Sequence, residues 1–363
     1  MNATKSNRIF YLDALRALAI SCVIVIHVYA VSTDYLGGQY TSVIPTFQWF
    51  FGQTLGNCFR IGVDLFLMLA GALSLGRDWT IRGFLSKRIP RIVEPYVFWC
   101  LITCFIIIVL SYYNQVVYLT SFDWQSIVQY IYGAFMATSM GFEPYWFFWM
   151  ILGTYLIMPI FNKWLANCEL EEVEYFLVIW LVTCLFDYTL MKDFPINLTY
   201  FTSPIGFVIL GYYLRNTKRK ILNNPYFDLG IVLVSAISML IISWQLSTHD
   251  AIICLDRYSL PMAIEVAGVF LLFKNFDKFN LNLSDASNPI KSAFKKLVYY
   301  IAKYSYGIYL VQGLFLGIYS EKLPYHDYYS YTILMFILIM ASSMIIMHLL
   351  DKVPYINKVI GAK

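Results

Sequence analysis

The sequence alternates long apolar stretches with shorter polar segments, and this pattern predicts a bundle of membrane-spanning helices. Most of the stretches contain the roughly 17–25 predominantly apolar residues that cross a hydrocarbon core as an α-helix, and two are short. No polar segment between them is long enough for a soluble domain, so we expect one all-α, polytopic membrane domain over residues 1–363. The ten predicted spans are 9–31, 57–76, 92–113, 145–164, 173–191, 200–215, 227–247, 258–275, 298–319 and 328–350.

The distribution of basic residues predicts the orientation of this bundle. With the N-terminus inside the cell, the outside segments receive only Arg60, Lys192, Arg257 and Lys322, and Arg16 lies within the first span. All other Lys and Arg residues then fall on the inside, as the positive-inside rule requires. We therefore expect ten spans with both termini inside, in a multi-pass protein of the cell membrane. Outside the spans, the aromatic segment 124–137 predicts a helix that lies in the membrane interface.

The first predicted span contains Arg16 and His27, and ionisable groups within lipid are functional candidates by default. The two residues are eleven positions apart, which places them on one helix face about 16 Å apart along the axis. Asp13 lies one turn before Arg16 and is its expected partner. A structural alternative stays open, in which Asp13 and Arg16 form a snorkelling ion pair and His27 bonds to a carbonyl group.

A second cluster lies at the outer entrance of the second span. Arg60 and Asp64 are four residues apart and are candidates for an interfacial ion pair. In the functional alternative, Arg60 lies at the depth of His27, so that the histidine acts as a base and the arginine stabilises an oxyanion. Gly62 and Gly71 are expected to let another helix approach closely.

Two further clusters are candidates for ligand binding at opposite ends of the bundle. The basic segment with Arg82, Lys87, Arg88 and Arg91 lies before the third span, and is explained either by positive-inside anchoring or by binding of a phosphorylated cytosolic ligand.

Near the outer end of the fourth span, Glu143, Tyr145 and Trp146 are explained either by an aromatic belt or by a sugar site, because aromatic rings stack on sugars while a carboxylate binds hydroxyl groups.

The cysteine spacing and the absence of several known motifs reduce the kinds of site that the sequence could form. Seven cysteines are scattered through or near the predicted spans, without the spacing of a disulfide framework, and we interpret them as small packing residues. We expect no metal ion. The sequence has no phosphate-binding glycine loop, nucleophile elbow or zinc motif.

Five motifs in order resemble the acyltransferase family 3 membrane proteins. They are Arg16 with His27, then GVDLFLMLAG, KRIPRIVEPY, the YWFF run leading to Pro159, and YSYGIYLVQ. Together they span essentially the whole chain, and they are most similar to the compact O-acetyltransferases of surface polysaccharides that lack a soluble domain. One position departs from the pattern: Ala70 stands where the family usually has serine before the glycine, so the role of that hydroxyl is in doubt.

This resemblance implies transfer of an acyl group, usually acetyl from acetyl-CoA as co-substrate, to a hydroxyl of a surface glycan or its lipid-linked precursor. It implies that His27 is the catalytic histidine and Arg16 its companion, with Arg60 as a further candidate. Arg88 and Arg91 fall in the family's basic segment, and together with Arg82 and Lys87 they are expected to hold the nucleotide end of the donor. Glu143, Tyr145, Trp146 and Asp64 are the candidates for acceptor binding. Some relatives move succinyl instead.

Other functions stay open from the sequence. The same buried groups would suit a transporter of a glycan or lipid-linked sugar, and a non-enzymatic scaffold of an envelope-synthesis complex would tolerate their loss. The expected partners are an acyl-CoA donor, a glycan acceptor and membrane lipids, with no nucleic acid. A homo-oligomer or a larger envelope-synthesis assembly is compatible with the sequence.

Overall fold

The computed structural model describes residues 9–39, 44, 46–192, 204–246, 254–279, 289–325 and 327–362, and the regular elements in these ranges are all helical. This agrees with the predicted all-α class. The α-helices are α1 (Phe10–Gln39), α2 (Thr46–Cys58), α3 (Gly62–Ser74), α4 (Ile81–Tyr112), α5 (Trp124–Phe135), α6 (Trp146–Leu165), α7 (Leu170–Leu185), α8 (Ile205–Asn216), α9 (Pro225–Leu246), α10 (Leu260–Lys274), α11 (Pro289–Lys322), α12 (Tyr328–Leu350) and α13 (Ile356–Val359).

Each predicted span contains a helix, although several boundaries differ. Within the described residues, seven segments are long and apolar enough to cross a membrane, so the count of ten spans and the orientation stay predictions. Helix α4 begins at Ile81, well before the predicted 92, because Thr80 caps it by accepting a hydrogen bond from the Gly83 amide at 3.0 Å. The predicted span 57–76 is divided between α2 and α3 by a corner before Gly62.

Helix α5 confirms the helix predicted in the segment 124–137. It begins after Asp123, whose side chain accepts hydrogen bonds from the Ser121 hydroxyl at 2.6 Å and from the Ser126 amide at 3.0 Å. These bonds favour the charged carboxylate and hold the pKa of Asp123 well below its usual range. Whether α5 lies in the membrane interface stays a prediction.

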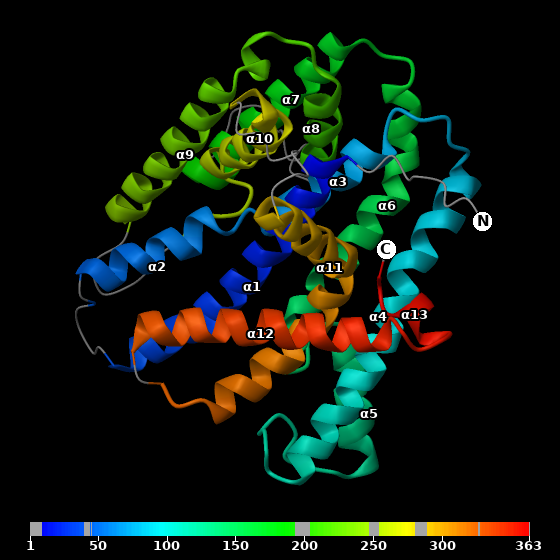
Figure 1. Cartoon of the computed structure of the whole chain (residues 1–363), viewed down its shortest axis with the longest axis vertical. Helices are drawn as coiled ribbons and strands as arrows, with labels where there is room; N and C mark the ends of the chain where they lie inside the picture. Colours follow the sequence, from blue (N-terminus) through cyan, green and yellow to red (C-terminus); the bar gives the residue numbers. More distant parts are fainter. Residues whose placement is uncertain are drawn as a thin grey trace.

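Helix α1 lies at the centre of the bundle and crosses it diagonally (Figure 1). It packs against α2, α3, α10, α11 and α12. Leu15, Ala19, Ile20, Ile24 and Val28 are completely buried along its length. Because lipid tails are as apolar as these side chains, close packing rather than the hydrophobic effect holds such helices together. The central position places Asp13, Arg16 and His27 within the helical bundle.

The closest helix approach is made by glycines on α3 and α8. A Cβ on Gly71 would lie 1.8 Å from the Val208 carbonyl oxygen, and a Cβ on Gly211 would lie 2.0 Å from that of Met68. Gly62 similarly faces the Ala19 carbonyl oxygen on α1, at 2.7 Å from a built Cβ. The predicted close approach at Gly62 and Gly71 is confirmed, and it fixes α3 between α1 and α8.

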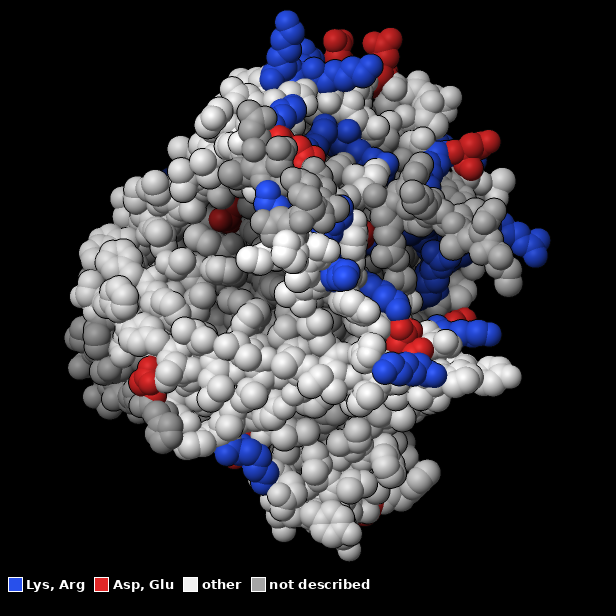
Figure 2. Space-filling view, in the orientation of Figure 1, with Lys and Arg blue, Asp and Glu red and all other residues white. Residues whose placement is uncertain are grey.

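Charged side chains are distributed unevenly over the surface. In the face drawn in Figure 2, lysines and arginines gather over the upper and right-hand parts, where α4, α7 and α8 are found in Figure 1. The lower left of this face, over α12 and the ends of α1 and α2, is almost free of them. This asymmetry is what the positive-inside rule would produce with the predicted orientation.

The glycine contact between α3 and α8 leads to a stability prediction. Gly211→Ala should lower the thermal midpoint of the protein in detergent, because its Cβ would collide with a backbone oxygen and overpacking typically costs about 1–3 kcal/mol. The matched control is Gly230→Ala on α9, where a Cβ meets no atom within 4 Å. This control should keep or slightly raise the midpoint, because alanine favours helix by about 1 kcal/mol. Equal midpoints for the two variants would contradict the close crossing.

Candidate active site

His27 lines a cavity of about 190 Å³, here called the His27 cavity. Its walls come from α1, from the corner between α2 and α3, from the start of α3, from the first residue of α6 and from the segment before α10. The lining residues are Val23, Ile26, His27, Phe59, Arg60, Gly62, Val63, Trp146 and Arg257. The cavity therefore combines one imidazole, two guanidinium groups and an otherwise mostly apolar wall.

One ring nitrogen of His27 is left without a hydrogen bond by the described residues. Its Nδ1 atom is buried and has no hydrogen-bond partner among the described residues. Its polar neighbour is Gln312 of α11, whose two amide atoms are also buried without a partner. A histidine bonded to a carbonyl group, the structural alternative from the sequence, is not what this part of the structure contains. Buried polar groups normally find partners, so a ring nitrogen without one, on a side chain that lines a cavity, indicates a ligand site.

Arg60 lies in the same cavity as His27, as the functional alternative required. Its Nη1 donates a hydrogen bond to the Leu255 carbonyl oxygen at 2.9 Å. The ion pair expected between Arg60 and Asp64 is absent from the described residues, and both carboxylate oxygens of Asp64 are buried without a hydrogen bond. The expectation of a direct pair was wrong because Arg60, in the corner between α2 and α3, turns toward the segment before α10.

A buried amide network fixes this arrangement. The Oδ1 of Asn57 accepts the Leu255 amide at 2.9 Å, while its Nδ2 donates to Gln53 Oε1 at 2.8 Å and to Ser243 Oγ at 3.1 Å. Asn57 and Arg60 therefore hold the N–H and C=O groups of Leu255 from α2 and from the corner after it. The segment that carries Arg257 is thereby fixed beside the His27 cavity.

Only part of the aromatic motif predicted to bind the acceptor reaches this cavity. Trp146 lines it, and the Arg257 guanidinium stacks on the Trp146 ring at 4.0 Å from the centroid. Glu143 is exposed and accepts the Gly141 amide at 2.9 Å, and buried Tyr145 donates to the Leu310 carbonyl oxygen at 2.7 Å. The structure thus places Glu143 and Tyr145 outside the His27 cavity, in roles that stabilise the fold.

Asp64 also lies outside the lining, buried behind the two arginines that influence it electrostatically. Arg257 was not selected from the sequence, because no motif surrounds it. The sequence signal that could have identified Arg257 is its place among the few basic residues predicted on the outside.

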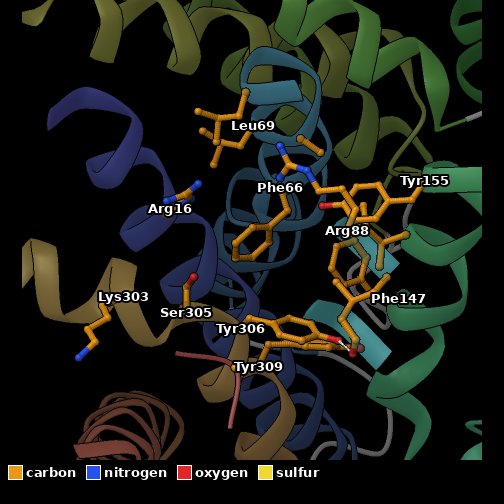
Figure 3. A pocket seen from close by; sticks show the side chains of 15 residues that line it. Arg16, Phe66, Leu69, Arg88, Phe147, Tyr155, Lys303, Ser305, Tyr306 and Tyr309 are labelled. Atoms are coloured by element: carbon orange, nitrogen blue, oxygen red, sulfur yellow. Dashed lines mark hydrogen bonds between the residues drawn. The ribbon is translucent and has the colours of Figure 1, made fainter. Parts of the chain in front are cut away.

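Arg16 lines a second cavity of about 90 Å³, here called the Arg16 cavity (Figure 3). Arg16 and Arg88 reach into it from opposite sides, from α1 and α4. Arg16 forms the expected ion pair with Asp13, at 3.3 Å between Nη1 and Oδ1. Arg88 stacks over Phe84 at 6.0 Å, and its Nε is buried with no hydrogen-bond partner within the described ranges. The cavity thus has two guanidinium groups facing each other.

The other basic residues predicted to bind the donor lie outside this cavity. Arg82, Lys87 and Arg91 are exposed, and Lys87 lies over the Trp79 ring at 5.1 Å. Lys303 does line the cavity, but it pairs with Asp351 at 2.5 Å and points away from the centre in Figure 3. Of the basic segment, the structure brings Arg88 alone to the Arg16 cavity.

Aromatic residues separate the two cavities. Phe66 and Phe147 line the Arg16 cavity at ring centroids 6.1 Å apart, and Phe147 contacts Tyr309 at 5.5 Å. Val63, one helical turn before Phe66, and Trp146, one position before Phe147, line the His27 cavity instead. The two cavities are therefore neighbours along α1 with an aromatic layer between them. Ala70, which stands where the family usually has serine, lines the Arg16 cavity with a methyl group.

The structure defines a polytopic helical membrane protein with two adjacent cationic cavities along one central helix. The chain belongs to acyltransferase family 3, because the family model described as an acyltransferase domain matches residues 9–350 of the 363. This confirms the resemblance recognised from the motifs. Neither the curated proteins nor the solved structures yield a match to this chain. Within the described ranges, no group of three or more His, Cys, Asp or Glu side chains is placed to hold a metal ion.

The buried network under the His27 cavity leads to a second stability prediction. Asn57→Ala should lower the thermal midpoint in detergent, because it leaves the Leu255 amide without its acceptor, at a cost of about 1–3 kcal/mol. The matched control is Asn167→Ala, since the exposed Asn167 donates only to the Lys163 carbonyl oxygen at 2.7 Å. A loss of stability in the control as large as that in Asn57→Ala would contradict the role given to the network.

Proposed function

We propose that the protein is an integral membrane O-acyltransferase that moves acetyl from acetyl-CoA to a hydroxyl of a surface polysaccharide or lipid-linked glycan. The observation that carries the proposal is the buried Nδ1 of His27, which has no hydrogen-bond partner among the described residues, on a side chain that lines the same cavity as Arg60. Membership of acyltransferase family 3 supports the reaction class. Because the donor is cytosolic and the acceptor belongs to the cell surface, the proposed location is the plasma membrane.

In the proposed reaction, His27 is the general base. It takes the proton of the acceptor hydroxyl, whose oxygen attacks the thioester carbonyl carbon and forms a tetrahedral oxyanion. The Arg60 guanidinium stabilises the negative charge on this oxygen. The intermediate collapses by breaking the carbon–sulfur bond, and the thiolate of coenzyme A takes the proton from His27. Direct transfer of this kind needs no acyl-enzyme.

The Arg16 cavity suits the passage of the donor. The nucleotide end of acetyl-CoA carries phosphates, which arginine binds well, and Arg88 and Arg16 are the arginines that line this cavity. The pantetheine arm is on the order of 15–20 Å long, and the rise of α1 separates Arg16 from His27 by about 16 Å. A thioester would therefore reach His27 once Phe66 and Phe147 move aside, without passage of the whole cofactor.

His27→Gln should abolish acyl transfer, by at least about a hundredfold, because glutamine keeps the polarity and approximate size of the side chain but cannot accept the proton. The measurement is transfer of labelled acetyl from acetyl-CoA to glycan by protein in lipid nanodiscs. The matched control, His348→Gln, changes an exposed histidine of α12 and should retain wild-type transfer. Normal acylation by His27→Gln, with glycan export lost instead, would favour a transporter and contradict the proposal.

A comparison of two neighbouring arginines tests the donor route. Arg88→Gln should raise KM for acetyl-CoA about tenfold or more, because a charge-assisted hydrogen bond contributes about 1.5–3 kcal/mol. Arg91→Gln, which changes an exposed arginine one turn away, should have a much smaller effect. Equal effects of the two substitutions at low and high salt would mean that the donor recognises a diffuse basic surface and does not enter the Arg16 cavity.

A further inference from the structure

The charge of the His27 cavity is more positive than acyl transfer to a neutral sugar requires. Its charged lining residues are Arg60 and Arg257, and none of its lining residues is acidic. A single guanidinium is sufficient to stabilise one oxyanion, and the proposed function assigns that role to Arg60. Arg257 is left over, as a partly buried guanidinium that the proposed reaction does not use.

The guanidinium of Arg257 is positioned but not used by the protein. It stacks on the Trp146 ring at 4.0 Å and lies 6.0 Å from the Tyr258 ring. It makes no hydrogen bond or ion pair with any residue of the described ranges. Stacking leaves the edge of the guanidinium free, and this edge carries five N–H donors in a planar arrangement that fits a carboxylate or phosphate.

Neither Asp64 nor Asp256 occupies these donors. Asp64 influences both Arg257 and Arg60 electrostatically, but both of its oxygens are buried and accept no hydrogen bond within the described residues. Asp256 is turned toward the backbone, where its Oδ1 accepts the Tyr258 amide at 2.8 Å. Both carboxylates moderate the potential of the cavity, and the donor edge of Arg257 stays available to a ligand.

The segment around Arg257 is fixed at several points, as a binding site requires. The Leu255 peptide is held by Asn57 and Arg60 at 2.9 Å each, and the Leu260 amide donates to Thr189 Oγ1 at 2.8 Å. Four residues thus separate two anchored positions, and Arg257 is one of them. Preorganisation of this kind lowers the entropy cost of binding.

We propose that Arg257 binds a negatively charged group of the acceptor, a carboxylate or a phosphate, next to the hydroxyl that receives the acyl group. Trp146 is then a positioning residue that holds Arg257. The inference rests on the proposed function and specifies its acceptor class as an anionic glycan. Charge pairing with Arg257 would place the acceptor hydroxyl against His27 before the donor arrives.

The test uses the protein in lipid nanodiscs, labelled acetyl-CoA, and envelope glycan from the source cells with its O-acyl groups removed by mild alkali. One portion of the glycan has its carboxyl groups reduced to alcohols, and another has its phosphodiesters cleaved. The expected result is that one of the two treatments raises KM for the glycan about tenfold, as loss of a charge-assisted hydrogen bond does. Which treatment acts distinguishes a carboxylate from a phosphate.

Arg257→Gln should raise KM for the untreated glycan about tenfold, and this effect should fall below about twofold on the treated glycan that has lost the recognised charge. Arg257→Lys should restore part of the affinity because it keeps the charge. Lys322→Gln is the control, since Lys322 is exposed and donates only to Gln115 Oε1 at 2.8 Å.

Three results would overturn the inference. Equal KM values for untreated and both treated glycans would mean that no anion is recognised. A fall in kcat of Arg257→Gln with every glycan, at unchanged KM, would make Arg257 a second oxyanion donor. A fall in the yield of folded protein shared by Arg257→Gln and Arg257→Lys, with no change in KM ratios, would make it structural. Absence of acetyl transfer by the wild type to any glycan would instead contradict the proposed function itself.

Discussion

Charged and titratable side chains inside an apolar helical bundle must face one another or an internal cavity, because lipid tails solvate them poorly. In this protein the constraint applies most directly to α1, which carries Arg16 and His27 on one face. The bundle meets it by surrounding α1 with α3, α10, α11 and α12. Arg16 then faces Asp13 and one cavity, and His27 faces another. The rest of the candidate site is arranged about this helix.

Close backbone contact makes the enclosure possible. Gly62 allows α3 to lie against α1 at Ala19, and Gly71 allows α8 to lie against α3. This tight packing places the corner before α3, which carries Arg60, beside His27. It also places Phe66 across from Phe147, so that an aromatic layer separates the two cavities. Small residues with no chemistry of their own thus determine where the reactive groups meet.

The parts of this arrangement that depend on local sequence were predictable. Helical spacing was sufficient to place Arg16 beside Asp13 and to separate it from His27, and apolar stretches located the helices. Consecutive helices tend to be antiparallel neighbours, so the second span was expected to start on the side where the first span ends, which brings Arg60 near His27. Hydrogen bonds between segments distant in the sequence were not predictable, and the Arg60 bond to Leu255 replaced the expected pair with Asp64. Arg257 was missed for the same reason, because its position depends on contacts with α2 and α6.

The aromatic motif shows the limit of reasoning from residue types. Tyr145 and Trp146 are adjacent, yet one is buried against α11 and the other lines the His27 cavity, because consecutive helical positions point about 100° apart. The sequence predicted that the motif lies at the end of a span. Which of the two rings faces the His27 cavity depends on the rotation of α6 about its axis, and the packing of the whole bundle sets this rotation.

The central claim is that a donor from one side and an acceptor from the other meet at His27. Sealed vesicles with uniformly oriented protein test it most directly, with labelled acetyl-CoA enclosed on the side of the Arg16 cavity and a membrane-impermeant glycan on the opposite side. The account predicts that label appears on the external glycan while free coenzyme A stays inside the vesicle. Transfer only when acetyl-CoA and glycan are on the same side of the membrane would contradict it.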